Sequence, residues 1–181
     1  MTSIIKVDTI QTSAGGTPTA SSLGIGGVGK IGQRVASSKF TSGASSSTST
    51  TYVSTPVTAN ITPSSTSSNI LIAFTLNIYK TGGDNEIDVR VLRTVGGVDT
   101  EVIETGSLFT SNSNDNGDTL CIVTNDAPST TSQITYTVQF RRAAGTGTVA
   151  TNISASKRAE MTLMEVLAEW LSQDMKDGTT L

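Results

Sequence analysis

The sequence predicts an all-β protein built as an antiparallel sandwich or jelly roll, and three observations lead to this fold class. Several segments alternate apolar and polar residues with the period of two that is typical of strands. Turn-forming residues separate these segments at intervals of roughly 10–15 residues, as in sandwiches and jelly rolls. Serine and threonine make up 55 of the 181 residues, and threonine, valine and isoleucine favour pleated, half-buried strands.

The residues before the first of these strands, 1–40, predict an extended arm rather than a packed domain. Seven glycines fall in the first 32 residues, and few large side chains accompany them. Such a segment gains the free energy of ordering only from partners. The apolar residues that we expect to make partner contacts are Ile4, Ile5, Val7 and Ile10.

One motif in this arm, Gly24–Gly29, has the spacing GxGxxG. A dinucleotide-binding loop would follow a buried strand and would be followed by an acidic residue about 20 positions later. Here a Ser/Thr/Gly run precedes the motif, and the next acidic residue is Asp84. We therefore interpret the glycines as a flexible or tightly packed strap.

The strands of the predicted sandwich follow within residues 41–166. Tyr52–Ile61 reads as an edge strand, because Pro56 cannot donate a hydrogen bond within a central ladder. Asn69–Tyr79 alternates along its whole length. The residues that we expect on the core face are Ile70, Ile72, Phe74, Leu76, Tyr136, Val138 and Phe140.

Further strands are predicted at intervals along the chain. Their ranges are Glu86–Arg93, Thr100–Thr105, Thr119–Thr124, Gln133–Arg142 and Gly145–Ser154. Cys121 lies within one of them between apolar neighbours, so we expect it to be a small buried residue rather than a nucleophile.

Two groups of polar residues are weighed as sites and interpreted as solvated surface. Asn112–Gly117, within the polar loop 111–118, resembles the start of a calcium loop, but its twelfth position is Val123 rather than a bidentate glutamate. We interpret one group of basic residues as the solvated end of a strand or, alternatively, as a contact for an acidic surface: Arg141, Arg142, Lys157 and Arg158.

Composition and charge exclude several functions. Twelve basic and fifteen acidic residues give a net charge of −3, which argues against a nucleic-acid partner. Without histidine, histidine triads, histidine bases and histidine metal ligands cannot form. One cysteine makes neither an internal disulfide nor a multi-cysteine zinc site. We expect no catalysis and no cofactor.

We also expect neither a cleaved targeting signal nor a membrane-spanning segment. The opening residues contain no apolar run of signal-peptide length, so we expect synthesis in the cytoplasm without a cleaved signal. The longest uncharged apolar stretch, Ile70–Phe74, is too short to span a bilayer, and we expect no membrane insertion.

The C-terminal segment is open to two interpretations. Met161, Met164, Ala168, Leu171 and Met175 have the spacing of a helix stripe, and propensity favours a helix over residues 159–176. The first part of this range, 161–166, also fits a strand.

A family resemblance favours the strand. Residues 57–72, 125–140, 147–152 and 161–166 resemble a β-domain common in structural proteins of tailed bacteriophages, especially marine and cyanobacterial phages. The opening residues 5–19 resemble the leader of many tail-fibre proteins of these phages. The resemblance implies a jelly-roll sandwich, similar to C1q and tumour-necrosis-factor heads, that forms a homotrimer without enzymatic activity.

The resemblance also implies how the chain is divided and used. We expect an attachment arm (1–40), a jelly-roll domain (41–166) and a C-terminal tail (167–181) with a short helix over 167–176. The tail residues that we expect at the trimer axis or on a neighbour are Trp170, Leu171 and Met175. A ten-residue helix does not persist alone in water, so folding back on its own sandwich is the alternative.

The implied location is the virion, after synthesis in the cytoplasm of the bacterial host. The first hypothesis is a tail fibre or adhesin whose arm contacts a tail adaptor or nozzle protein and whose sandwich faces a host receptor. The alternative is a capsid decoration or head-fibre protein that stabilises the major capsid protein.

Overall fold

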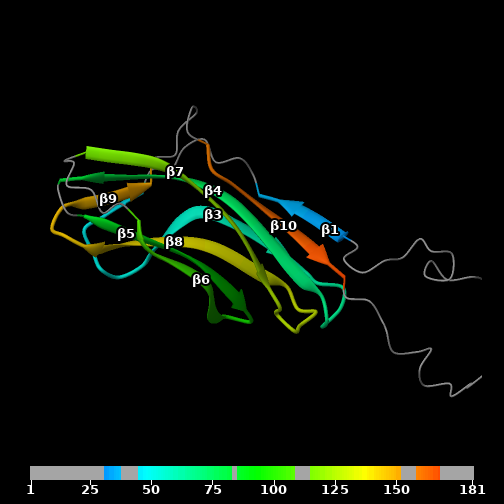
Figure 1. Ribbon diagram of the computed structural model, residues 1–181. Helices are drawn as coiled ribbons and strands as arrows, with labels where there is room; N and C mark the ends of the chain where they lie inside the picture. The colour runs from blue at the N-terminus through cyan, green and yellow to red at the C-terminus, as the bar shows by residue number, and fades with distance from the viewer. Residues whose placement is uncertain (1–30, 38–44, 83–84, 109–114, 152–157, 168–181) are drawn as a thin grey trace, which may run out of the picture. The chain divides into compact units, whose positions relative to one another are not determined.

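The computed structural model describes residues 31–37, 45–82, 85–108, 115–151 and 158–167, which form two antiparallel β-sheets packed face to face (Figure 1). These residues belong to one compact unit, Ile31–Leu167, and no helix occurs among them. The described part of the chain is a jelly-roll-like β-sandwich, and the predicted fold class is confirmed.

The first sheet is organised around its longest strand, β4. Its members are β1 (Ile31–Ala36), β2 (Ser45–Ser47), β4 (Asn69–Thr81), β7 (Asp115–Asp126), β9 (Thr148–Thr151) and β10 (Glu160–Val166). β7 pairs along one edge of β4. The other edge is shared, because β10 pairs with residues 69–75 and β9 with residues 78–81. β1 continues the sheet beyond β10, and β2 continues it beyond β9.

The second sheet has the order β3-β8-β5-β6. Its strands are β3 (Val53–Ile61), β5 (Glu86–Val95), β6 (Val98–Leu108) and β8 (Ile134–Ala144). β5 and β6 form a hairpin whose central residues, Gly96 and Gly97, have φ values of 57° and 83°. Such a turn requires positive φ twice, which glycine adopts without strain. The steps from β3 to β4, β4 to β5, β6 to β7 and β7 to β8 cross between the sheets, as in a jelly roll.

The core lies between the two sheets and contains the residues expected from the alternation. All seven predicted core residues are at most 2% exposed: Ile70, Ile72, Phe74, Leu76, Tyr136, Val138 and Phe140. The alternating residues of β5 and β10 complete this layer with Ile87, Val89, Val91, Met161 and Leu163. The strand prediction for Pro56 is also confirmed, because β3 lies at the edge of its sheet.

Two strands extend much further than the sequence predicts. β6 extends to Val98–Leu108 and β7 to Asp115–Asp126, where turn-forming residues mark the predicted ends. β7 pairs with β4 over its full length, and this ladder overrides the weak local preference of asparagine, aspartate and glycine for turns.

The helix that propensity favours over residues 159–166 is wrong, because these residues form the strand β10. Met161 and Leu163 face the core, and Thr162 and Met164 face outward. Pairing with β4 therefore outweighs the helix propensity of these residues. The predicted helix over 167–176 lies, apart from Leu167, outside the described residues.

β1 lies inside the range 1–40 that we expect to be an arm, yet it pairs with β10 as part of the sheet. The arm expectation therefore concerns residues 1–30, which lie outside the described part of the chain.

Candidate functional site

The outer face of the first sheet carries mainly small and apolar side chains. We define the uncharged face as Leu71, Ala73, Thr75, Cys121, Val123, Thr162 and Met164. The register places them side by side, since Leu71 lies opposite Met164 on β10 and Ala73 lies between Thr162 and Val123. Val123 is 63% exposed on β7, which pairs only with β4 and forms an edge of this sheet, so a large apolar side chain stands in water there.

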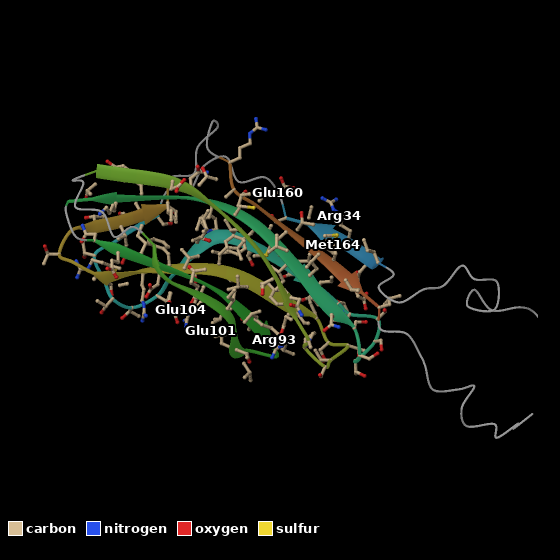
Figure 2. The ribbon with its side chains drawn as sticks, in the orientation of Figure 1. Arg34, Arg93, Glu101, Glu104, Glu160 and Met164 are labelled. Carbon is tan, nitrogen blue, oxygen red and sulfur yellow. The ribbon has the colours of Figure 1, made fainter. Side chains whose placement is uncertain are left out.

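Two charged side chains from the strands of this sheet lie on the same side. Arg34 of β1 is opposite Met164, and Glu160 of β10 is opposite Thr75. Figure 2 shows Arg34, Met164 and Glu160 along β1 and β10, whereas Arg93, Glu101 and Glu104 lie on the side of β5 and β6. The charged groups of the sandwich are thus distributed unevenly between its two sides.

The outer face of the second sheet carries a connected set of ion pairs. Arg141 contacts Asp88 at 2.8 Å and Glu104 at 3.0 Å. Arg90 contacts Glu101 at 3.1 Å and donates a 2.8 Å hydrogen bond to the side chain of Gln139. The side-chain hydrogen bond to Asp88 raises the pKa of Arg141, so this face holds its charges in pairs.

Tyr52 is enclosed by this cluster. Its ring centroid lies 3.9 Å from the Arg90 guanidinium carbon and 4.6 Å from that of Arg141, which is the geometry of cation–π contacts. Its hydroxyl is buried without a well-aligned hydrogen-bond partner. Burial first, and then the neighbouring Glu104 carboxylate, raise the pKa of Tyr52 well above its ordinary value.

A second network joins the two sheets at one end of the sandwich. Arg93 of β5 contacts Asp126 of β7 at 2.7 Å, and the Tyr136 hydroxyl donates a 2.7 Å hydrogen bond to the same carboxylate. Burial, followed by this hydrogen bond, raises the pKa of Tyr136. Because β5 and β7 belong to different sheets, this network fixes the sheets relative to each other.

A buried carboxylate, Glu165, fixes the place where β1 meets the sandwich. Glu165 is 1% exposed and accepts hydrogen bonds from the Ser64 N–H at 2.6 Å, the Ser64 hydroxyl at 2.8 Å and the Gln33 amide at 2.8 Å. Gln33 also donates to the carbonyl of Thr62 at 2.6 Å. Burial alone would raise the pKa of Glu165, but the nearby Ser68 hydroxyl and the hydrogen bonds from Ser64 and Gln33 outweigh it and hold the pKa below its ordinary value.

The prediction that Cys121 is buried is wrong. Cys121 is exposed, because Leu120 and Ile122 take the inward positions of β7 and leave Cys121 and Val123 outside. An apolar run does not by itself show which residues face inward; the ladder with β4 decides it.

The other candidate residues of the sequence fall in different places. Of the basic group, Arg141 is held by two carboxylates rather than standing free in water. The expected contact residues Ile4, Ile5, Val7, Ile10, Trp170, Leu171 and Met175 lie outside the described residues. So do Gly24–Gly29 and residues 111–114 of the loop 111–118, whose remaining residues belong to β7.

The described ranges contain no group of three or more cysteine, aspartate or glutamate side chains that could hold a metal ion. They also contain no helix long and apolar enough to cross a membrane. Within these ranges the two outer faces of the sandwich differ: one carries paired charges and the other is largely uncharged.

Sequence reasoning missed the Tyr52 cluster and the Glu165 network. Arg141 and Asp88 come from strands that are distant in sequence, so no local spacing marks them. Glu165 carries a weak signal, because a glutamate stands at an inward position of the closing strand. A charge at such a position indicates a buried network with several donors.

No known protein family matches the sequence, and comparison with curated proteins gives no match. Among solved structures, the chain is similar to a structure of the Gx strain of infectious bursal disease virus, with 13% identity and a TM-score of 0.40 over 77% of this chain and 37% of that chain. It is also similar to the Eiger tumour necrosis factor of S. frugiperda, with 13% identity and a TM-score of 0.39 over 77% of this chain and 98% of that chain. Scores this low carry no argument about function.

Proposed function

We propose that the protein is a structural subunit of a bacteriophage virion: a homotrimeric tail fibre or adhesin, without enzymatic activity, that attaches through its N-terminal arm and presents the β-sandwich to the host. The family resemblance of the sequence supports the virion role. The jelly-roll-like sandwich agrees with what that resemblance implies about the fold.

The observation that carries the proposal is the unequal character of the two outer faces. On the second sheet, Arg90 and Arg141 are paired with acidic side chains, so that face is suited to water. On the first sheet, Val123, Leu71 and Met164 stand on a face with few charges. Exposed apolar side chains such as Val123, on a face with few charges, favour a contact surface, and cyclic homo-oligomers cover such a surface most simply.

The remaining expectations fit this arrangement and stay part of the proposal. The arm, residues 1–30 with Ile4, Ile5, Val7 and Ile10, leads into β1, which is held on the sandwich by the ladder with β10 and by Gln33. The tail residues Trp170, Leu171 and Met175 contribute to the trimer contact. The arm's partner is a tail adaptor or nozzle protein.

Two matched variants test the uncharged face. Val123→Arg places a charge on this face, and Val98→Arg places the same charge on β6 of the other sheet, where the valine is 69% exposed. We expect Val123→Arg to dissociate the oligomer in light scattering and Val98→Arg to leave it intact. An oligomer that tolerates both variants would show that subunits meet elsewhere.

The virion role is tested on purified particles of the phage that encodes the protein. Antibodies against the sandwich, visualised with gold in electron micrographs, should label the tail. Labelling over the capsid would assign the decoration role instead, and particles that lack the protein altogether would contradict the virion proposal.

A further inference from the structure

We propose that the uncharged face meets a second copy of the chain with Arg34 of one subunit paired to Glu160 of the next. The inference rests on the proposed homo-oligomer and names the polar contact that sets the register between its subunits.

Charged side chains on the two sheets differ in whether they have partners. Three of the four arginines of β5 and β8 in the second sheet lie within 3.1 Å of a carboxylate: Arg90 with Glu101, Arg93 with Asp126, and Arg141 with Asp88 and Glu104. The fourth, Arg142, donates a 3.0 Å hydrogen bond to the carbonyl of Gly147. Within the described ranges, neither Arg34 nor Glu160 forms an ion pair or a side-chain hydrogen bond. Figure 2 shows these two side chains along β1 and β10 near Met164, away from Arg93, Glu101 and Glu104.

Arg34 and Glu160 are too far apart to pair within one subunit. Arg34 is opposite Met164, and Glu160 lies four residues from Met164 along β10, at roughly 13 Å for a strand. The two side chains therefore do not meet within one subunit, although they have opposite charges and belong to neighbouring strands. Met164 and Thr162 lie between them on β10.

The charges of Arg34 and Glu160 are complementary to those of a second copy of the same surface. A strongly acidic partner would match Arg34 but repel Glu160, and a strongly basic partner would do the reverse. A second copy supplies one charge of each sign at the same spacing, so every contact of a cyclic oligomer can repeat the Arg34–Glu160 pair. Because the uncharged residues around it exclude water, such an ion pair fixes the register between subunits and disfavours other alignments of the two subunits.

The experiment is a charge exchange in the full-length protein, followed by sedimentation equilibrium across a range of protein concentrations. We expect Arg34→Glu and Glu160→Arg each to raise the dissociation constant by about tenfold or more, because each brings like charges together. The double variant restores the pair with its signs exchanged, and its dissociation constant should return to within about threefold of wild type.

The neutral variant Arg34→Gln/Glu160→Gln gives a second measurement that does not depend on repulsion. Its association should lose the salt dependence that the wild-type pair confers, since an ion pair is screened by salt. Circular dichroism checks that each variant folds, which we expect because neither residue is in the core.

Several outcomes would overturn the inference. If each single exchange leaves the dissociation constant unchanged, the two charges do not meet. The same conclusion follows if the dissociation constant of the double variant rises by the product of the two single increases. If Val123→Arg dissociates the oligomer while the exchanges have no effect, the pair is wrong and the uncharged face remains the interface. If the wild-type protein is monomeric and Arg34→Glu only weakens binding to purified particles, another virion protein covers this face.

Discussion

Replacing Glu165 with alanine tests whether the buried carboxylate holds β1, β10 and the β3–β4 connection together. The variant removes the acceptor for three hydrogen bonds of 2.6–2.8 Å from Ser64 and Gln33. Because Ser64 is exposed, water can accept hydrogen bonds from its N–H and hydroxyl after Glu165 is removed. The Gln33 amide keeps its hydrogen bond to the carbonyl of Thr62. All three lost bonds are made to a charged acceptor.

The expected loss follows from these contacts. Hydrogen bonds to a charged group contribute about 1.5–3 kcal/mol each, and removing one partner is less costly where water can enter. Three bonds with partial compensation give a loss of about 3 kcal/mol in the free energy of unfolding. For a chain of this length the midpoint temperature would fall by roughly 6–12 °C. Glu101→Gln is the control, because it removes a more exposed carboxylate worth at most about 1 kcal/mol.

The pH dependence provides a second signature. The pKa of Glu165 is lower in the folded protein than its ordinary value of 4.5, so the folded state binds fewer protons. Its stabilisation is therefore present above pH 4.5 and is lost as the pH falls through the folded pKa. Glu165→Gln has no charge to titrate and should show a flatter loss of stability on acidification.

Urea unfolding followed by circular dichroism, at one fixed protein concentration and at pH 7 and below 4.5, measures both effects. The reasoning is refuted if Glu165→Ala stays within about 0.5 kcal/mol of wild type at pH 7, which is the range of surface substitutions. It is equally refuted if Glu165→Ala and Glu101→Gln are destabilised to the same extent.

Further predictions concern the core, one sheet-bridging hydrogen bond, one turn and the tail. Phe74→Ala should lose about 3–5 kcal/mol of stability in the same urea assay, and a loss under about 1 kcal/mol would place Phe74 outside the core. Tyr136→Phe should cost about 1 kcal/mol; because the folded pKa is raised, the contribution of Tyr136 is present below pH 10 and fades above it, so the variant should lose less stability on alkalisation than wild type. Gly147→Ala would drive a methyl group into the Asn85 side chain and the Thr81 carbonyl and should cost about 1–3 kcal/mol, whereas Gly106→Ala, with open space around it, should not. Deleting residues 167–181 should weaken the trimer in light scattering while circular dichroism stays that of a sandwich; unchanged mass and melting would remove the tail from assembly.

Much of the fold could be predicted from the sequence because its strands alternate with a strict period of two. Phe74 and Tyr136 illustrate this, since each stands at an inward position of a long, regular run and is buried as expected. Periodicity is local information, and it suffices wherever a strand is covered on one face only.

Partner strands decide what the sequence leaves open. Residues 161–166 carry helical spacing and strand alternation at once, and the ladder with β4 selects the strand. Cys121 lies in an apolar run whose two faces cannot be told apart until β4 fixes the register. Both cases depend on contacts across more than 40 residues of chain, which no window of sequence contains.

The candidate contact surface was predictable only in part. The sequence indicates assembly through its arm and tail residues but does not mark the uncharged face, because Leu71, Val123 and Met164 come from three strands. The same holds for Arg34 and Glu160, whose lack of an ion-pair partner within the described residues becomes visible only beside the ion pairs of the other sheet.

The central claim is that this sandwich assembles with copies of itself into a trimer. Sedimentation equilibrium of the full-length protein from nanomolar to micromolar concentration tests it most directly. The account predicts a particle of three times the 18.7 kDa chain mass in the micromolar range, with dissociation as the protein is diluted. A single species of 18.7 kDa throughout the micromolar range would contradict it.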